Sequence, residues 1–425
     1  MEPQTRLGLA ELTRCAFEGG DLASLKMELL GRCQGGPGQA SAMMDLSVIE
    51  QLQGNLAYGL EWQLKALAQC RLFRTLRTAK HGGSHTKRLL VFAAPIHMGG
   101  NTPVEFLLPS GPFEILTLYP NAEDIGALPE FDVAFCAAPA DEVFADAFFA
   151  QVRALTRGTG KPVLNLPDNL VKPERDTLPQ LFRNVPGLHI PKTLRLHRED
   201  LIEALGSEVE TGLLDLIGGY PVVIRPVGSH AGLGLARLGD PGDLITYLAA
   251  RGEAEFFVGE YIDYASASDG QFRKYRIVLV DGQPLPCHMA ISDQWDVWYM
   301  NAKMTEAPDK RREEAAFMDR FACDFAERHK GAFEALWCGI GFDYFGLDCA
   351  EDAAGNLVVF EVDNALIVHD MDCRATFPYK QTHMRAVFSS FEAMLLHRCA
   401  AEEGLQMNRI APRKQLQMSE PAVFY

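Results

Sequence analysis

Apolar residues recur every three to four positions through most of the N-terminal part of the chain, and this spacing predicts helices. The pattern runs through residues 7–19, 22–33 and 43–76. The third stretch is long enough for two helices that join at the Gly-Asn pair 54–55. We therefore expect the chain to begin with a helical region.

The pattern changes after a polar linker at residues 80–88. Short apolar runs that end in proline, glycine or asparagine follow, and a helical stretch precedes the last of them. Strands that alternate with helices in this way indicate a small parallel α/β domain. The runs are residues 88–95, 113–119, 132–139 and 161–167, and the helical stretch is 140–158.

From residue 174 onward the pattern predicts strands mixed with helices. Residues 174–206 indicate a helix, a strand and a helix, whereas 310–337 and 381–404 are amphipathic and helical. The turns at residues 281–282 and 354–356 fit antiparallel hairpins. The predicted strands are residues 221–226, 256–261, 273–282, 284–292, 345–350 and 357–366, and the tail after Arg409 has no periodicity.

Composition and charge exclude some classes of protein. The 425 residues are 48% hydrophobic, which lets every domain bury a core, and a net charge of −16 argues against a nucleic-acid surface. No apolar run approaches the roughly 20 residues that span a bilayer, and no signal peptide begins the chain. Ten scattered cysteines without a CxxC pair indicate a reducing compartment. We expect a cytoplasmic protein without nucleic-acid or membrane partners.

A β-branched strand delivers Arg225 to a loop that contains Gly228, Gly232 and Gly234. Glycines let backbone amides approach phosphate oxygens, and a fixed cation neutralises their charge. The segment therefore predicts a phosphate-binding loop, although it is neither a P-loop nor a Rossmann fingerprint. The alternative is a glycine-rich hairpin with a surface arginine.

Three carboxylates lie on neighbouring predicted strands: Asp348, Glu361 and Asp363. Glu361 and Asp363 are two residues apart, so they share one face of a strand. Convergent carboxylates repel unless a cation holds them, and hard oxygen ligands favour magnesium. The alternative is a set of strand-end acids on a solvated face, which the apolar flanking residues disfavour.

A third group is basic. Arg273, Lys274 and Arg276 precede a strand, and His288 follows the next turn. These cations fit a clamp for phosphates or for a substrate carboxylate. As alternatives, Arg273 points to solvent and His288 is a core histidine.

In this order the motifs resemble the ATP-grasp superfamily, within it RimK-like proteins, and more narrowly bacterial proteins that join a tetratricopeptide-like region to an ATP-grasp module. The phrases NTPVEFLL, RPVGSHAG, RKYRIVLVDG and FEVDNALIVH carry the narrower likeness. Residues 57–73 resemble one degenerate tetratricopeptide helix pair, but one repeat cannot establish a solenoid, so a plain helical bundle remains the alternative.

The resemblance implies a fold that is both α/β and α+β, with two lobes that enclose a nucleotide. It divides the chain into a helical tetratricopeptide-like region (1–80), a pre-ATP-grasp α/β domain (88–170), an N-lobe with the glycine loop (171–255), a C-lobe with the metal site (256–400) and a tail (401–425).

The resemblance also implies roles for single residues. Arg175 and Arg225 stand where the superfamily has lysines that contact ATP, and Arg276 resembles the basic residue near the γ-phosphate. The implied ATP contacts are Arg175, Arg225, Gly228, Ser229, His230, Gly232, Gly234, Glu260, Tyr261, Ile262 and, for the ribose, Asp269. The implied ligands of two magnesium ions are Asp348, Glu361 and Asp363, where the superfamily usually has E-x-N.

The implied activity is that of an ATP-dependent carboxylate–amine ligase. An acyl phosphate would form from ATP, and an amine would displace phosphate to give an amide or peptide bond. The expected catalytic residues are Arg225, Arg273, Lys274, Arg276 and His288, and the expected acceptor pocket is Ser292, Trp295, Tyr299, Asn301, Lys303 and His369. A kinase on the same fold and a non-catalytic, nucleotide-regulated binding protein are the alternatives. The amine could come from an amino acid, a peptide or a protein, and dimers are common in the superfamily.

Overall fold

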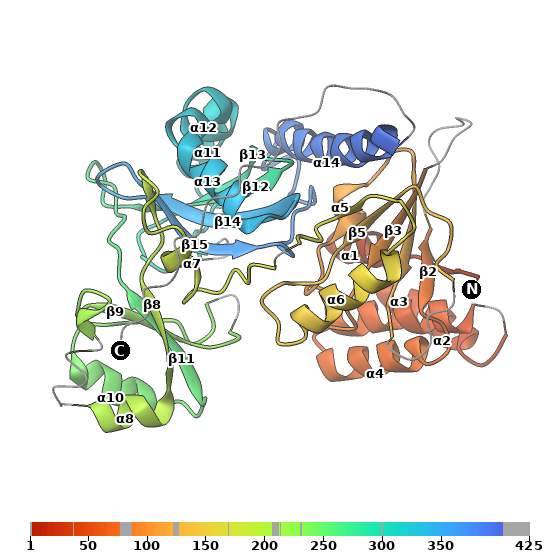
Figure 1. Cartoon of the computed structure of the whole chain (residues 1–425), viewed down its shortest axis with the longest axis horizontal. Coiled ribbons are helices and arrows are strands. Elements are labelled where there is room, and N and C mark those ends of the chain that lie inside the picture. Colours follow the sequence, from red (N-terminus) through yellow and green to blue (C-terminus); the bar gives the residue numbers. More distant parts are fainter. Residues whose placement is uncertain are drawn as a thin grey trace.

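The computed structural model describes residues 2–36, 38–76, 87–121, 127–168, 170–205, 212, 214–229, 232–298 and 301–402. Strands within these residues form three sheets. Figure 1 shows the N-terminal helices and the first sheet on one side, and the second and third sheets on the other. In this part of the chain, no helix combines the length and apolar character needed to cross a bilayer.

The N-terminal region is helical, as its periodicity predicts. Residues 40–50 of the third helix are all buried, so this helix forms the centre of the region. No tetratricopeptide-type repeat is established by these helices. Their bounds are α1 (Leu9–Phe17), α2 (Leu22–Arg32), α3 (Gln39–Leu52) and α4 (Leu56–Leu67).

Two strands in this region were not predicted. β1 (Gln4–Arg6) pairs with β2 (Leu72–Thr75), and β2 pairs with a strand of the α/β domain. The prediction of a helix through residue 76 is therefore wrong at its end. Leu72 and Phe73 are fully buried, and pairing with a distant strand overrides the local helical period there.

The first sheet has the order β1-β2-β4-β3-β5-β6. Its last four strands are parallel, as the alternation of strands and helices predicts, and only β2 meets β4 antiparallel. The carboxyl ends of β3 and β5 therefore lie side by side. The bounds are β3 (Lys87–Phe92), β4 (Phe113–Leu118), β5 (Val133–Cys136) and β6 (Val163–Leu164), with helices α5 (Val104–Leu107) and α6 (Ala145–Thr156).

The second sheet is antiparallel, in the order β10-β9-β11-β8, and has its own hydrophobic core. Ile224 and Phe256, on its two central strands, are fully buried in that core. The bounds are β8 (Thr193–His197), β9 (Val222–Pro226), β10 (Ala236–Leu238) and β11 (Glu255–Glu260), with helices α8 (Arg198–Ala204) and α10 (Pro241–Ala249).

The third sheet has the order β13-β12-β14-β15-β7. Both predicted hairpins are present, because β12 and β13, and β14 and β15, pair antiparallel. The strands are β7 (Leu188–His189), β12 (Phe272–Val280), β13 (Gln283–Ser292), β14 (Tyr344–Glu351) and β15 (Leu357–Asp363). The accompanying helices are α7 (Leu178–Leu181), α11 (Pro308–Arg320), the 3-10 turn η1 (Phe321–Cys323), α12 (Phe325–Arg328), α13 (Lys330–Ile340) and α14 (Lys380–Glu402).

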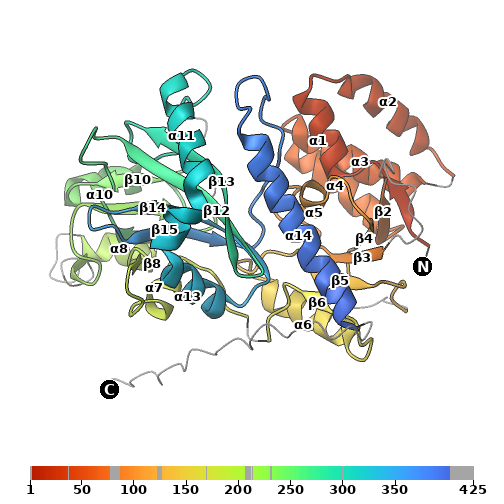
Figure 2. The ribbon, with the colours of Figure 1, turned by 90° about the horizontal axis from the view of Figure 1, so that it is seen from above.

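Helix α14 joins the two halves of the molecule. Its buried residues pack in one cluster with residues of β3, β4 and β5 and of β12 and β14. Figure 2 shows α14 between the first and third sheets. The expected α/β and α+β fold is therefore present. The limits of the five parts remain predictions, and β1 and β2 place strands of the first part in the sheet of the second.

Asn165 links the first sheet to the third through its side chain. Its amide donates to the Tyr344 carbonyl at 2.8 Å and accepts from the Tyr344 N–H at 2.7 Å. Asn165 is fully buried and has a φ of 52°, which asparagine tolerates better than most residues. The pair therefore satisfies the backbone of a buried strand end.

We expect Asn165→Ala to lower the free energy of unfolding by about 2–4 kcal/mol, because it leaves two buried backbone groups unpaired. Chemical denaturation measures the change. Asn55→Ala, at an exposed position, is the control and should have a much smaller effect. Equal effects of the two substitutions would contradict the role given to Asn165.

Candidate nucleotide and substrate site

A cavity of about 750 Å³ lies between the second and third sheets and extends to loops of the first sheet. This volume falls within the range of small-molecule sites. Most residues singled out in the sequence line it: Arg175, Arg225, Gly232, Glu260, Tyr261, Ile262, Lys274, Arg276, His288, Trp295, Asp348, Glu361 and Asp363.

Asp348 is the most deeply buried charge of the cavity wall, with 3% of its surface exposed. It lies opposite Arg276 in the β12–β14 ladder, and Arg276 donates to both of its oxygens at 2.8 and 3.1 Å. The Lys274 Nζ lies 2.7 Å from the same carboxylate. Burial raises the pKa of Asp348, but these two cations outweigh it and hold the pKa well below its usual range.

Glu361 lies opposite Asp348 in the β14–β15 ladder and is paired with a different cation. The Arg175 Nη2 donates to Glu361 Oε1 at 2.7 Å, and Nη1 donates to the Phe360 carbonyl. Burial raises the pKa of Glu361, but the charges of Arg175, Lys274 and Arg225 together outweigh burial, and the net pKa is lowered. The register of β12, β14 and β15 thus places two carboxylates and two cations on one wall, and Arg175 adds a third cation from the segment before α7.

Asp363 has the opposite electrostatic character. Burial and the nearby charge of Glu361 raise its pKa to about 7. An acid in this state gains from a nearby cation, and carboxylate oxygens are the ligands that magnesium prefers. Within the described ranges, however, no group of three or more His, Cys, Asp or Glu side chains is arranged to hold a metal ion. The magnesium ligands therefore remain a prediction.

Arg225 lies at the end of β9 and holds the glycine loop. Its Nε donates to Ser229 Oγ at 3.1 Å, and its guanidinium also donates to the Ser229 carbonyl. Burial and the nearby Arg175 lower the pKa of Arg225 to about 10. A guanidinium group whose charge is destabilised by burial and by a neighbouring arginine is a suitable site for an anion.

The glycines of this loop are required by its backbone. Gly228, Gly232 and Gly234 have φ values of 73°, 74° and 70°, a region that disfavours side chains. Gly232 lines the cavity, whereas Gly228, Ser229 and Gly234 are not among its lining residues. His230, predicted to contact ATP, lies outside the described residues.

The resemblance implies a nucleotide hinge at Val258 to Ile262, and its last three residues, the predicted ATP contacts Glu260, Tyr261 and Ile262, line the cavity at the end of β11 and just beyond it. The Glu260 N–H donates to the Lys192 carbonyl at 2.8 Å, so this N–H already has a hydrogen-bond partner within the chain. The Glu260 carboxylate lies 3.2 Å from His189 Nε2, on a strand of the third sheet. This contact links the second sheet to the third beside the hinge.

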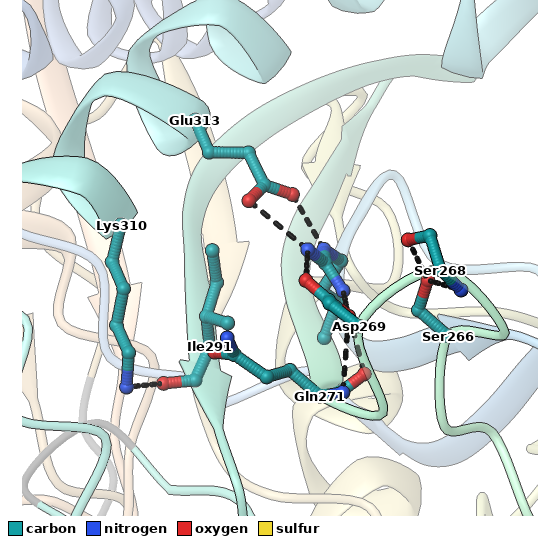
Figure 3. A network of polar contacts seen from close by, with 8 residues as sticks. Ser266, Ser268, Asp269, Gln271, Ile291, Lys310 and Glu313 are labelled. Atoms are coloured by element: carbon teal, nitrogen blue, oxygen red, sulfur yellow. Dashed lines mark hydrogen bonds and ion pairs between the residues drawn. The ribbon is translucent and has the colours of Figure 1, made fainter.

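Arg273 and Asp269 do not line the cavity but bind each other. The Arg273 Nη2 donates to Asp269 Oδ2 at 2.7 Å and to Glu313 Oε2 at 3.0 Å. Figure 3 shows Asp269 and Glu313 in this network of polar contacts. These contacts tie the loop before β12 to helix α11. The structure thus places the predicted catalytic arginine and ribose contact in an ion-pair network outside the cavity wall.

The expected acceptor residues are also separated. Trp295 lines the cavity, and its ring meets Tyr261 edge-on at 5.8 Å. His369 packs against the rings of Phe17 and Phe106 instead. Ser292, Asn301 and Lys303 are not among the lining residues, and Tyr299 lies outside the described part of the chain.

Sequence reasoning missed one end of the cavity. This end is formed by two loops that follow the adjacent parallel strands β3 and β5. Chain order reverses between these strands, and ligands of open α/β sheets gather at such switch points. The switch-point rule could therefore have pointed to these loops from the predicted strand order. The missed residues are His97, Gly99, Gly100, Pro139, Asp141 and Glu142.

No protein-family model matches the chain, and no curated protein matches it. Solved structures do match. The chain is similar to a RimK-domain ATP-grasp protein from Sphaerobacter thermophilus DSM 20745, with 17% identity, coverage of 73% of this chain and 99% of that one, and a TM-score of 0.40.

It is also similar to a D-alanine–D-alanine ligase from Bacillus anthracis, with 16% identity, coverage of 75% and 99%, and a TM-score of 0.44. A third match is the ATP-grasp ligase PsnB in complex with a precursor peptide and AMPPNP, with 14% identity, coverage of 72% and 98%, and a TM-score of 0.40. The ATP-grasp resemblance seen in the sequence thus recurs among solved structures. At these scores it carries no conclusion about activity, which depends on the cavity residues.

The His189–Glu260 contact predicts a pH-dependent stability. The hydrogen bond to Glu260 raises the pKa of His189 above its usual 6.5. A group whose folded pKa is raised stabilises fully below its unfolded pKa, and the contribution is lost as pH rises through the folded value. We therefore expect His189→Gln to lower the unfolding midpoint more at about pH 5.5 than at about pH 8.5.

Thermal unfolding at the two pH values measures this difference. His197→Gln, an exposed histidine on β8, is the control. An equal loss at both pH values for His189→Gln would show that the ion pair does not contribute.

Proposed function

We propose that this chain is an ATP-dependent carboxylate–amine ligase that forms an amide or peptide bond through an acyl phosphate. One observation carries the proposal: a single cavity brings the half-buried arginines Arg175 and Arg225 together with the carboxylates Asp348, Glu361 and Asp363. The cations suit a polyphosphate, and the carboxylates suit its metal ion.

The nucleotide would lie between the second and third sheets. Apolar residues of both sheets line this part of the cavity beside the Glu260–Ile262 hinge and suit an adenine ring: Ile190, Val223, Phe257, Val359 and Phe360. Arg225 and Arg175 would bind the phosphates, because their mutual repulsion is relieved by an anion. The loop from Gly228 to Gly234 would cover them.

Magnesium would be held by Asp363 and Glu361, with Asp348 beside them, and would neutralise phosphate charge when bound. Asp348 is already neutralised by Arg276 and Lys274. These two cations therefore adjoin the position of the γ-phosphate in the proposed complex. Arg276 is the residue that would stabilise negative charge as that phosphate is transferred.

The proposed reaction has two steps. A substrate carboxylate oxygen attacks the γ-phosphorus, the bond between this phosphorus and the bridging oxygen breaks, and ADP leaves. An amine nitrogen then attacks the acyl carbon, loses a proton, and displaces inorganic phosphate. Positioning and charge neutralisation by Arg225 and Arg276 contribute most to such a transfer.

The test measures nucleotide products from ATP and magnesium with pooled amino acids and peptides, and with hydroxylamine as an amine trap. ADP together with a hydroxamate is the expected result, because hydroxylamine captures an acyl phosphate. ADP with a phosphorylated product and no hydroxamate would indicate a kinase. AMP as the product, or ATP that stays intact with every pool, would contradict the proposal.

We expect Arg225→Ala to weaken ATP binding by about 10- to 100-fold, the range for one lost hydrogen-bonded charge contact. Isothermal titration with a non-hydrolysable ATP analogue and magnesium measures it. Arg273→Ala is the contrast, because Arg273 pairs with Asp269 and Glu313 outside the cavity wall, and ATP affinity should be retained. The opposite ranking of the two variants would contradict the proposed phosphate site.

A further inference from the structure

At the cavity end that the sequence analysis missed, the loop after β3 lies close to a segment of the third sheet. The loop after β3 contributes His97, Gly99 and Gly100, and the segment after β15 contributes Leu366 and Ile367. The loops touch, since a Cβ atom added to Gly99 would lie 3.4 Å from the Ile367 side chain. The position of one loop therefore affects the other.

The N-terminal helices hold the first of these loops by its backbone. The Met98 N–H donates to Gln51 Oε1 at 2.8 Å, and Gln63 Nε2 donates to the Ile96 carbonyl at 2.9 Å. Gln51 belongs to α3 and Gln63 to α4, so both bonds connect distant parts of the chain. They bracket His97 on its two sides.

The second loop has a similar contact. The Arg14 Nη2, from helix α1, lies 3.0 Å from Asp370 Oδ1. The Phe17 ring of the same helix lies 6.0 Å from the His369 ring. Three N-terminal helices therefore contact the two loops.

Close packing does not fix the loop after β3. A small cavity of about 70 Å³ lies between α3, α4 and this loop, and Gln51, Gln63 and His97 all line it. A loop beside a void is held less firmly by packing than one in a filled core. Asn101 and Thr102 hold the far end of the loop through Ala94, Ala137 and Asn364. The two glutamine hydrogen bonds hold its middle, on either side of His97.

We propose that the N-terminal helical region positions the end of the cavity that receives the non-nucleotide substrate, with Gln51 and Gln63 as the positioning residues. This inference rests on the proposed ligase function for the meaning of the cavity. Arg225 and the Glu260–Ile262 hinge lie on other elements, so loss of the glutamine contacts affects the second substrate and leaves ATP binding intact.

Substitution of glutamine by glutamate is expected to keep the hydrogen bond to the loop at Gln51 and to remove it at Gln63. This contrast separates the effect of the hydrogen bond from that of side-chain packing. Gln51 accepts from the loop, so Gln51→Glu keeps the acceptor and Gln51→Leu removes it. Gln63 donates to the loop, so Gln63→Glu removes the donor, and Gln63→Met removes it without a buried charge. Thermal unfolding of each variant verifies that it is folded.

The first readout is hydrogen exchange of the full-length protein, in peptides that cover residues 94–104. We expect faster exchange in Gln51→Leu and Gln63→Met, and wild-type exchange in Gln51→Glu. Unchanged exchange in both Gln51→Leu and Gln63→Met would overturn the positioning role. This readout needs no substrate, so it decides the inference even if the ligase assay fails.

The second readout is kinetic and uses the amino acid or peptide pool that yields hydroxamate with the wild type. We expect KM for that substrate to rise about 5- to 10-fold in Gln51→Leu and Gln63→Met, as for one lost hydrogen bond each, while KM for ATP is unchanged. Equal increases in both KM values would overturn the inference. Absence of hydroxamate with the wild type would instead contradict the proposed function.

Discussion

The site depends on one constraint: a charged side chain buried on the cavity face of the third sheet needs an opposite charge beside it. Asp348 is almost fully buried on a central strand, and an unpaired carboxylate there would be strongly unfavourable. Arg276, on β12, lies directly opposite Asp348 and is its ion-pair partner. Glu361, on β15, lies opposite it on the other side and carries the same charge. A shift of β12 by one residue would move Arg276 and Lys274 to the other face and leave the buried Asp348 carboxylate without its cations. Charge pairing therefore stabilises one register, and that register forms the cavity wall.

The same pairing bears on how a nucleotide would be bound. Asp348 and Glu361 each already have a cation, and among the three predicted metal ligands only Asp363 has a raised pKa. Under the proposed function, arrival of a polyphosphate and its metal ion exchanges partners within an existing set of charges. Cations that now hold carboxylates would bind phosphate oxygens, and the carboxylates would bind the metal. Such an exchange avoids most of the cost of burying new charges.

Much of the fold could be predicted because its elements are locally coded. The hairpin turn at residues 281–282 and the period of helix α14 needed no tertiary information. The carboxylates and the arginines of the cavity were also visible, because charges within apolar strands are unusual. β1 and β2 were not visible, since they depend on pairing with a distant strand. The position of Arg273 could not be predicted for a related reason. The sequence around a basic residue near a strand is the same whether its side chain faces a ligand or an acid on a distant helix, and Arg273 pairs with Glu313 of α11.

The N-terminal region is linked to the site because it shares a core with the first sheet. Arg6 is buried and donates to Glu105 at 2.9 Å, and the opposite oxygen of Glu105 accepts from the Ala10 N–H at the start of α1. Asp45 of α3 accepts from the Leu7 and Gly8 N–H groups, and burial raises its pKa to about 6. These buried contacts join β1, α1, α3 and the segment just beyond the loop after β3. A region held this firmly behind a cavity loop can bias the loop's position without touching the ligand. Under the proposed positioning role, Gln51 and Gln63 transmit that effect to the middle of the loop.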